Sequence, residues 1–215
     1  MELLKNEYIF WSVLMAANVF MFLLNALINL FWSKQYKLKS LKISSLDIKT
    51  SLITLGVNVI VAIPGYYLFL GGKITFNQQG FLVDLVLLIF LFDVVMYILH
   101  YAFHIIWPFK KIHQHHHTHT YFNEFSLYVM NPLEALFFGL LLTLIAFVFN
   151  LNIYSFLLFI FFNWLYGVVA HLNTKSEKTP LFFGNSSFHK KHHALSNCNY
   201  GFYTVVWDKL FRTTS

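Results

Sequence analysis

Histidine is the residue type in this chain that most clearly suggests chemistry. The 215 residues include 11 histidines, all between His100 and His193. His100 and His104 are four residues apart, and on a helix this spacing places two side chains on one face, close enough to share a metal ion. Two later clusters have the spacing HxxHH, in which positions i, i+3 and i+4 also share a helical face. The first consists of His113, His116 and His117, and the second of His189, His192 and His193. His171 stands alone between them.

The number and type of these side chains predict a centre with two metal ions. Neutral imidazole is a common ligand of iron, zinc, copper and nickel, and a mononuclear site takes three or four protein ligands. The nine histidines named above are too many for one ion and fit two. The single cysteine, Cys198, excludes an internal disulfide and a cysteine-ligated cluster. Carboxylate-bridged di-iron sites of the four-helix type use Glu-x-x-His pairs, and the chain has none. We interpret the remaining histidines, His115 and His119, as exposed loop residues, with a spare metal ligand as the alternative.

The composition indicates that lipid is the solvent around this site. Hydrophobic residues make up 58% of the chain and charged residues 11%, whereas a soluble domain has about a quarter charged residues. The formal net charge of +6 does not indicate nucleic-acid binding, because the basic residues form no stripe on a soluble face.

Apolar segments of sufficient length predict the spans. A helix needs about 20 apolar residues to cross a bilayer. Residues 8–32, 52–70 and 81–99 satisfy this, with a kink expected at Pro64-Gly65. Residues 133–170 are too long for one span and suit a helical hairpin of two. We therefore predict an all-α transmembrane bundle of four or five spans with a histidine-rich helical cap. Residues 1–80 would form the N-terminal spans and a basic loop, and residues 81–215 the catalytic domain.

The basic residues predict the orientation. Residues 33–51, 105–132 and 171–215 hold 13 of the 15 Lys and Arg residues. Five spans place these three segments on one side, which the positive-inside rule makes cytoplasmic. The histidines are then on the cytoplasmic face. Residues 8–32 are too long for the apolar core of a cleavable signal peptide, so we expect a retained span.

The order of these motifs resembles the fatty acid hydroxylase/sterol desaturase superfamily. The family has an Asp and a Tyr before HxxxH, matched here by Asp93 and Tyr97, and then Lys-x-HxxHH, matched by Lys111 with His113, His116 and His117. Its Pro-Leu-Glu is matched by Pro132 to Glu134, and its lone His by His171 with Asn173. Its last HxxHH precedes Asn-Tyr-Gly and a Trp-Asp-Lys/Arg-Leu-Phe ending, matched here by Asn199 to Gly201 and by Trp207 to Phe211. The resemblance covers residues 81–213. Two departures are Asn131, where many relatives have His, and Tyr101, where most have Arg.

The resemblance implies two iron ions that activate O₂ and abstract hydrogen from a C–H bond of a lipid, such as a fatty acyl chain or a sterol. Hydroxylation is the leading reaction and desaturation the alternative, and zinc can occupy iron sites in a purified sample. The chain has no cysteine cluster or dinucleotide fingerprint, so a separate cytochrome or ferredoxin would supply the electrons. A non-catalytic metal carrier or sensor and a structural membrane protein are the competing classes. A carrier would need ligands along a path across the membrane, and the first two spans contain no histidine.

Polar side chains near the ligands are expected to orient them. Asp93 lies seven residues before His100, on the same helix face, and we predict that it accepts the N–H of a ligand imidazole. Glu134 and Asp208 are candidates for the same role, with a structural salt bridge or cap as the alternative for Asp208. Asn131 would stand in for a tenth histidine, directly or through water. Four aromatic residues are candidates for lining a lipid path, or for an ordinary interfacial belt: Phe103, Trp107, Phe122 and Tyr203.

Overall fold

The computed structural model describes residues 2–215 and is mostly helical, with almost no strand. Its α-helices are α1 Glu2–Lys5, α2 Glu7–Gln35, α3 Ser45–Ile60, α4 Ala62–Leu70, α5 Phe81–Ile105, α6 Phe109–His113, α7 Pro132–Val148, α8 Ile153–Ala170, α9 Ser186–Leu195 and α10 Val206–Phe211. Two 3₁₀ turns, η1 His116–Thr118 and η2 Ser126–Tyr128, and two short strands, β1 Phe76–Asn77 and β2 Leu151–Asn152, complete it. The predicted all-α fold is confirmed.

Four helical segments of the described chain are long and apolar enough to cross a membrane. They are α2, α3 with α4, α5 and α8, and α7 is a shorter apolar helix of 17 residues. The predicted hairpin within residues 133–170 is present as α7, β2 and α8. Large hydrophobic side chains remain exposed on the outer faces of the helices, among them Phe20, Phe90 and Leu157. These lengths and surfaces are those of a multi-pass membrane protein.

The second span is interrupted by its proline. Pro64 has no N–H to donate to the carbonyl of Ile60, four residues earlier. The helix accordingly divides there, with α3 ending at Ile60 and α4 beginning at Ala62. At this break α7 packs so closely that a Cβ on Gly139 would collide with the Val61 side chain.

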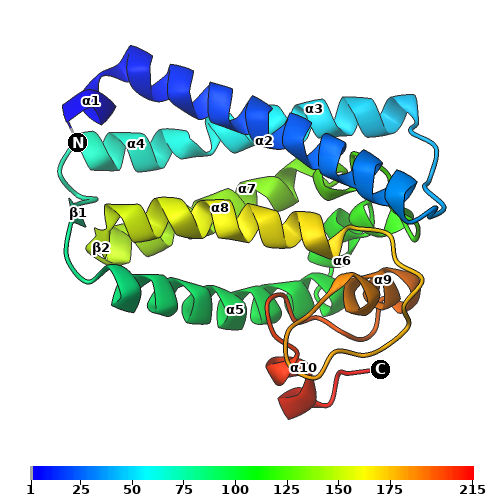
Figure 1. The fold of residues 1–215 in the computed structure, drawn as a ribbon. Helices are drawn as coiled ribbons and strands as arrows, with labels where there is room; N and C mark the ends of the chain where they lie inside the picture. The colour runs from blue at the N-terminus through cyan, green and yellow to red at the C-terminus, as the bar shows by residue number, and fades with distance from the viewer. Residues whose placement is uncertain (1) are drawn as a thin grey trace.

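The two ends of the bundle have different roles. At one end β1 pairs with β2 in parallel, and Asp84 accepts a hydrogen bond from the backbone N–H of Asn152 at 2.6 Å. Asp84, which has no role predicted from sequence, thus fixes the turn at β2. Figure 1 shows β1 and β2 at the end of the bundle opposite α6 and α9. The core between these ends consists of α5, α7 and α8 with Tyr203 from the C-terminal segment, and Leu88, Phe92 and Phe159 are fully buried in it.

Candidate metal centre

The histidines converge from five elements at one end of the bundle. His100 and His104 lie near the end of α5, His113 ends α6, and His116 and His117 lie in η1. His171 caps the C-terminus of α8, and His189, His192 and His193 lie on α9. In Figure 1 the ends of α5 and α8 meet α6 and α9 on the same side of the molecule. Residues up to 93 apart in the sequence therefore reach one site.

The nine predicted ligands form two compact groups. In each group, one potential ligand atom per residue lies within 4.8 Å of all the others. The five-histidine group contains His100, His104, His113, His117 and His192, and the four-histidine group contains His116, His171, His189 and His193. His115 and His119 belong to neither group.

Each HxxHH motif contributes to both groups. His113 and His117, four residues apart, join the five-histidine group, whereas His116 between them joins the other. On α9 the pair at i and i+4, His189 with His193, joins the four-histidine group, and His192 joins the five-histidine group. A shared helical face therefore does not place the three histidines of a motif in one group. Each motif instead bridges two adjacent centres.

The ring Nε2 atoms point inward at distances that suit a shared cation. Pairs within the groups are separated by 3.1–3.3 Å, including His100 with His113 at 3.2 Å and His189 with His193 at 3.1 Å. Two nitrogen ligands about 2.1 Å from a metal, at an angle of about 90–110°, are about 3.0–3.4 Å apart. The observed separations match the edges of a coordination polyhedron.

A direct hydrogen bond does not explain the short Nε2 separation between His100 and His113. A neutral imidazole has one N–H, and backbone carbonyls and carboxylates only accept. His100 Nδ1 lies 2.8 Å from the carbonyl of Tyr200, and His113 Nδ1 lies 2.7 Å from Glu134 Oε1, so both Nδ1 atoms donate. The Nε2 atoms of this pair, 3.2 Å apart, then present two lone pairs to each other. A cation between them resolves this repulsion.

The same reasoning applies in the four-histidine group. His116 Nδ1 donates to the carbonyl of Val129 at 3.2 Å, and His171 Nδ1 donates to that of Gly167 at 2.8 Å. Their Nε2 atoms, 3.2 Å apart, are therefore both unprotonated. The donor set of each group fits a nitrogen-ligated metal ion.

Burial keeps several of the grouped imidazoles in the neutral form that binds metal. It lowers the pKa of His117 to about 3 and that of His171 to about 4. Burial, together with neighbouring imidazoles, holds the pKa of His116, His189 and His192 well below its usual value. Metals compete with protons for imidazole nitrogen, so low proton affinity favours occupancy at neutral pH.

The polar residues predicted to orient the ligands act by different routes. Glu134 is 2% exposed and contacts His113 directly. Asp208 accepts hydrogen bonds from the backbone N–H groups of Tyr200 and Gly201 at 2.8 and 2.6 Å, and the carbonyl of Tyr200 in turn receives His100. Asp208 thus fixes a peptide segment that fixes a ligand. A Cβ on Gly201 would collide with the carbonyl of Thr204, so this turn requires glycine.

Asp93 and Asn131 lie outside the ligand contacts. Asp93 accepts hydrogen bonds from the backbone of Tyr203 and Thr204, from the Thr204 hydroxyl and from the Trp207 indole N–H, at 2.6–3.0 Å. It therefore anchors the C-terminal segment to α5. The carboxamide oxygen of Asn131 accepts from Leu133 N at 3.0 Å and caps α7.

Sequence reasoning missed the backbone carbonyls that orient the rings. The segment after α9 supplies two of them, Tyr200 to His100 and Cys198 to His192 at 2.7 Å, and a hydroxyl, Ser196 Oγ, 3.1 Å from His117 Nδ1. Every residue has a carbonyl, so residue type carries no signal for this role.

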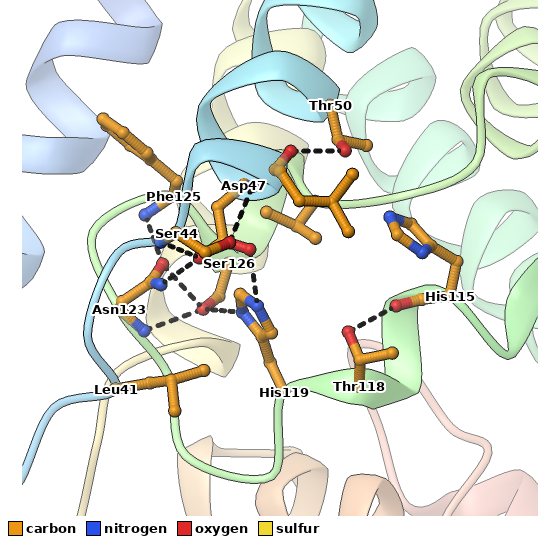
Figure 2. A network of polar contacts seen from close by, with 12 residues as sticks. Leu41, Ser44, Asp47, Thr50, His115, Thr118, His119, Asn123, Phe125 and Ser126 are labelled. Atoms are coloured by element: carbon orange, nitrogen blue, oxygen red, sulfur yellow. Dashed lines mark hydrogen bonds and ion pairs between the residues drawn. The ribbon is translucent and has the colours of Figure 1, made fainter.

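The interpretation of His119 as an exposed loop residue is wrong. His119 is 4% exposed, with Nε2 3.2 Å from Asp47 Oδ1 and Nδ1 2.7 Å from Ser126 Oγ (Figure 2). Asp47 also accepts from Asn123 Nδ2 at 3.0 Å. A buried carboxylate needs hydrogen-bond donors, and Asp47 finds them in His119 and Asn123. This network joins α3 to the loop that carries His116 and His117. His115 is half-buried.

The four candidate aromatic residues have separate surroundings. The Phe122 ring is completely buried against His171 and His193, with centroids 5.0 and 5.1 Å away. Phe103 packs on His113 at 5.6 Å. Tyr203 is in the core, whereas Trp107 is 78% exposed. Phe122 and Phe103 therefore form apolar walls of the two groups, and the other two residues do not.

Comparison with known proteins gives this arrangement a family. A Delta(7)-sterol 5(6)-desaturase of Candida albicans is 30% identical over 179 residues, which are 77% of this chain and 45% of that protein. Lathosterol oxidase of Homo sapiens is 23% identical over 141 residues, 65% of this chain and 47% of that protein. The chain thus spans about half the length of the curated relatives it matches. No solved structure matches it significantly. The fatty acid hydroxylase family matches residues 85–213, which include all nine grouped histidines, and the chain belongs to this family.

Proposed function

We propose that this protein is a membrane oxidoreductase that uses two iron ions and O₂ to hydroxylate a C–H bond of a lipid. The observation that carries the proposal is the convergence of nine histidine side chains into two adjacent groups with Nε2 atoms 3.1–3.3 Å apart. The family to which the chain belongs supports the reaction class. Bound iron would supply the redox chemistry that O₂ and an unactivated C–H bond require.

The protein's own residues would position and shield this centre. Glu134 holds the ring of His113 through Nδ1, which fixes its tautomer and leaves Nε2 free to ligate. The carbonyls of Tyr200 and Cys198 do the same for His100 and His192. Phe122 covers the four-histidine group with an apolar ring and excludes water from that side. These contacts would fix the tautomer and the orientation of the nitrogen ligands before any substrate binds.

Desaturation of a sterol-like lipid is the second candidate. It is favoured by the matched relatives, which include sterol desaturases and a sterol oxidase by name. Hydroxylation and desaturation share the first hydrogen abstraction, and they differ in whether the carbon then gains oxygen or a neighbouring carbon loses a second hydrogen. The site would face the cytoplasm, because the basic segments lie at the histidine end of the bundle. A separate cytochrome- or ferredoxin-type protein would reduce it.

Lipid analysis combined with metal analysis tests this function. Cells expressing the protein should accumulate a lipid that has gained one oxygen, and purified protein should bind about two metal ions per chain. The variants His104→Ala and His192→Ala should abolish product formation while the protein remains in the membrane. His115→Ala, outside both groups, is the matched control and should retain activity.

The alternatives give different results. Accumulation of a lipid that has lost two hydrogens would indicate that the reaction is desaturation and not hydroxylation. Full product formation by either ligand variant, or less than about one metal per chain after reconstitution with iron, would refute the di-iron enzyme.

A further inference from the structure

A basic pocket of about 410 Å³ lies beside the metal centre. The segment after α2, the loop before η2, the segment after α8 and α9 line it, and the lining includes four lysines and one glutamate: Lys37, Lys39, Lys175, Lys190 and Glu177. The ammonium groups of Lys39 and Lys190 both lie over the ring of Tyr121, 5.1 and 4.8 Å from its centroid. The pocket therefore concentrates positive charge around one concave space, which suits an anion.

The pocket lies at the C-terminal end of a candidate membrane span, α2. Lys37 and Lys39 follow α2, which ends at Gln35. Trp32 in the last turn of α2 packs against the C-cap residue Tyr36, with ring centroids 4.4 Å apart. Trp and Tyr are enriched at the level of lipid headgroups. Trp32 Nε1 also donates to the carbonyl of Asn173, which lines the pocket, at 3.0 Å. The interfacial aromatic pair and the pocket wall are thus one structure.

Lys37 occupies a backbone position that favours glycine. Its φ is +49°, and the hydrogen bonds Lys37 N to Lys34 O and Leu38 N to Ser33 O close α2 in the manner of a Schellman cap. Glycine is usual there because a side chain is disfavoured in the left-handed region. Despite this backbone strain, the position is occupied by a lysine, and that lysine lines the pocket.

We propose that this pocket binds the phosphate of an anionic phospholipid headgroup. The lysines supply charge-assisted donors for phosphate oxygens, and the concave shape and depth suit a headgroup at the bilayer surface rather than the broad convex face of an acidic protein. Basic pockets beside transmembrane helices recognise anionic lipids on this electrostatic basis. Bound lipid would link the ends of α2 and α8 beside the ligand His171.

Binding of matched lipids to the full-length protein in neutral detergent tests the proposal. Native mass spectrometry would compare dioleoyl phosphatidylglycerol with dioleoyl phosphatidylcholine, which have the same acyl chains. The wild type should bind the anionic lipid about tenfold more tightly, and the variant Lys37→Gly/Lys39→Gln should lose most of this preference. Lys37→Gly relieves the backbone strain, so loss of binding would not reflect misfolding. Lys34→Gln/Lys42→Gln removes the same charge from flanking positions outside the pocket and should keep the preference.

Four results would overturn the proposal. The first is that the wild type binds both lipids equally, and the second is that the flanking variant loses as much of the preference for the anionic lipid as the pocket variant. The third is that the pocket binds inorganic phosphate as tightly as the anionic lipid. The fourth is that the pocket variant binds lipid as the wild type does, but an acidic redox protein reduces its metal centre more weakly. The first two would indicate no site or only diffuse attraction. The third would identify a free-phosphate site, and the fourth a protein-docking site.

Discussion

The two histidine groups differ in how the protein supports them. In the five-histidine group, His113 donates to the buried carboxylate of Glu134. In the four-histidine group, His116 and His171 donate to neutral backbone carbonyls, and among the described residues the buried Nδ1 of His193 has no hydrogen-bond partner. A carboxylate makes the imidazole that it contacts a stronger ligand. The two metals would therefore have unequal electronic environments.

Their accessibility differs as well. All four members of the four-histidine group are buried, whereas His104 and His117 of the other group are only partly buried. The five-histidine group is thus the one that reaches toward the surface, and it has one more nitrogen ligand. The same residue type, histidine, can therefore build one enclosed and one more open site. The number of ligands and their hydrogen-bond partners should decide how much metal each site loses when a residue is substituted.

Removal of one ligand from each group should show the largest difference. His171→Ala leaves three histidines in its group, and we expect about one of two metals to be lost during chelator treatment. His117→Ala leaves four in the other group, a number that suffices for a closed site, so about two metals should remain. Metal content measured by mass spectrometry after desalting distinguishes these results. Equal loss from both variants would contradict the inequality of the groups.

Glu134→Gln should give the next largest effect, confined to the five-histidine group. The amide keeps the shape of the side chain and removes the charge that supports His113 Nδ1. Loss of such a partner lowers metal affinity about 10–100-fold. Chelator titration should therefore show one weakened metal and one unchanged metal per chain. Glu7→Gln, which changes an exposed glutamate in the first turn of α2, is the control and should leave both affinities intact. Equal weakening of both metals would argue against a local role for Glu134.

Much of this comparison follows from spacing, but the division between groups does not. HxxxH and HxxHH place side chains on a shared face only within one continuous helix. His113 ends α6 and His116 begins η1, so the first motif is not one continuous helix. On the continuous helix α9 the histidines at i and i+4 join one group and His192 joins the other, so even there a shared helical face does not specify the division. The spans were predictable because apolar length is a local property, and so was the break before Pro64.

Long-range partners explain the failed expectations. The expectation for Asp93 used its helical position relative to His100, but its hydrogen-bond partners lie 110–114 residues away in the sequence. His119 reads locally as a polar loop residue, yet its partner Asp47 is 72 residues away. Only the packing of α3 against the ligand loop brings them together, and no local pattern specifies that packing.

Asp47→Asn should give the smallest effect on metal binding, and it should act on both groups. Burial lowers the pKa of His119 below its usual value despite Asp47, so the neutral ring donates from Nε2 to the carboxylate and accepts at Nδ1 from Ser126. Loss of the charge weakens this contact and should lower stability by about 1–3 kcal/mol. Because η1 carries His116 and His117, one from each group, both metals should bind about two- to fivefold more weakly, less than the effect of a direct partner.

Asp84→Asn is the matched comparison at the opposite end of the bundle. Asp84 also accepts a partly buried hydrogen bond, from Asn152 N at 2.6 Å, so its loss should also reduce thermal stability. It contacts no ligand loop, and both metal affinities should stay unchanged. Thermal melting and chelator titration of the two variants separate stability from positioning. If Asp84→Asn weakened metal binding as much as Asp47→Asn, the effect would be one of global stability, and the link from α3 to the ligand loop would have no specific role in holding the two groups together.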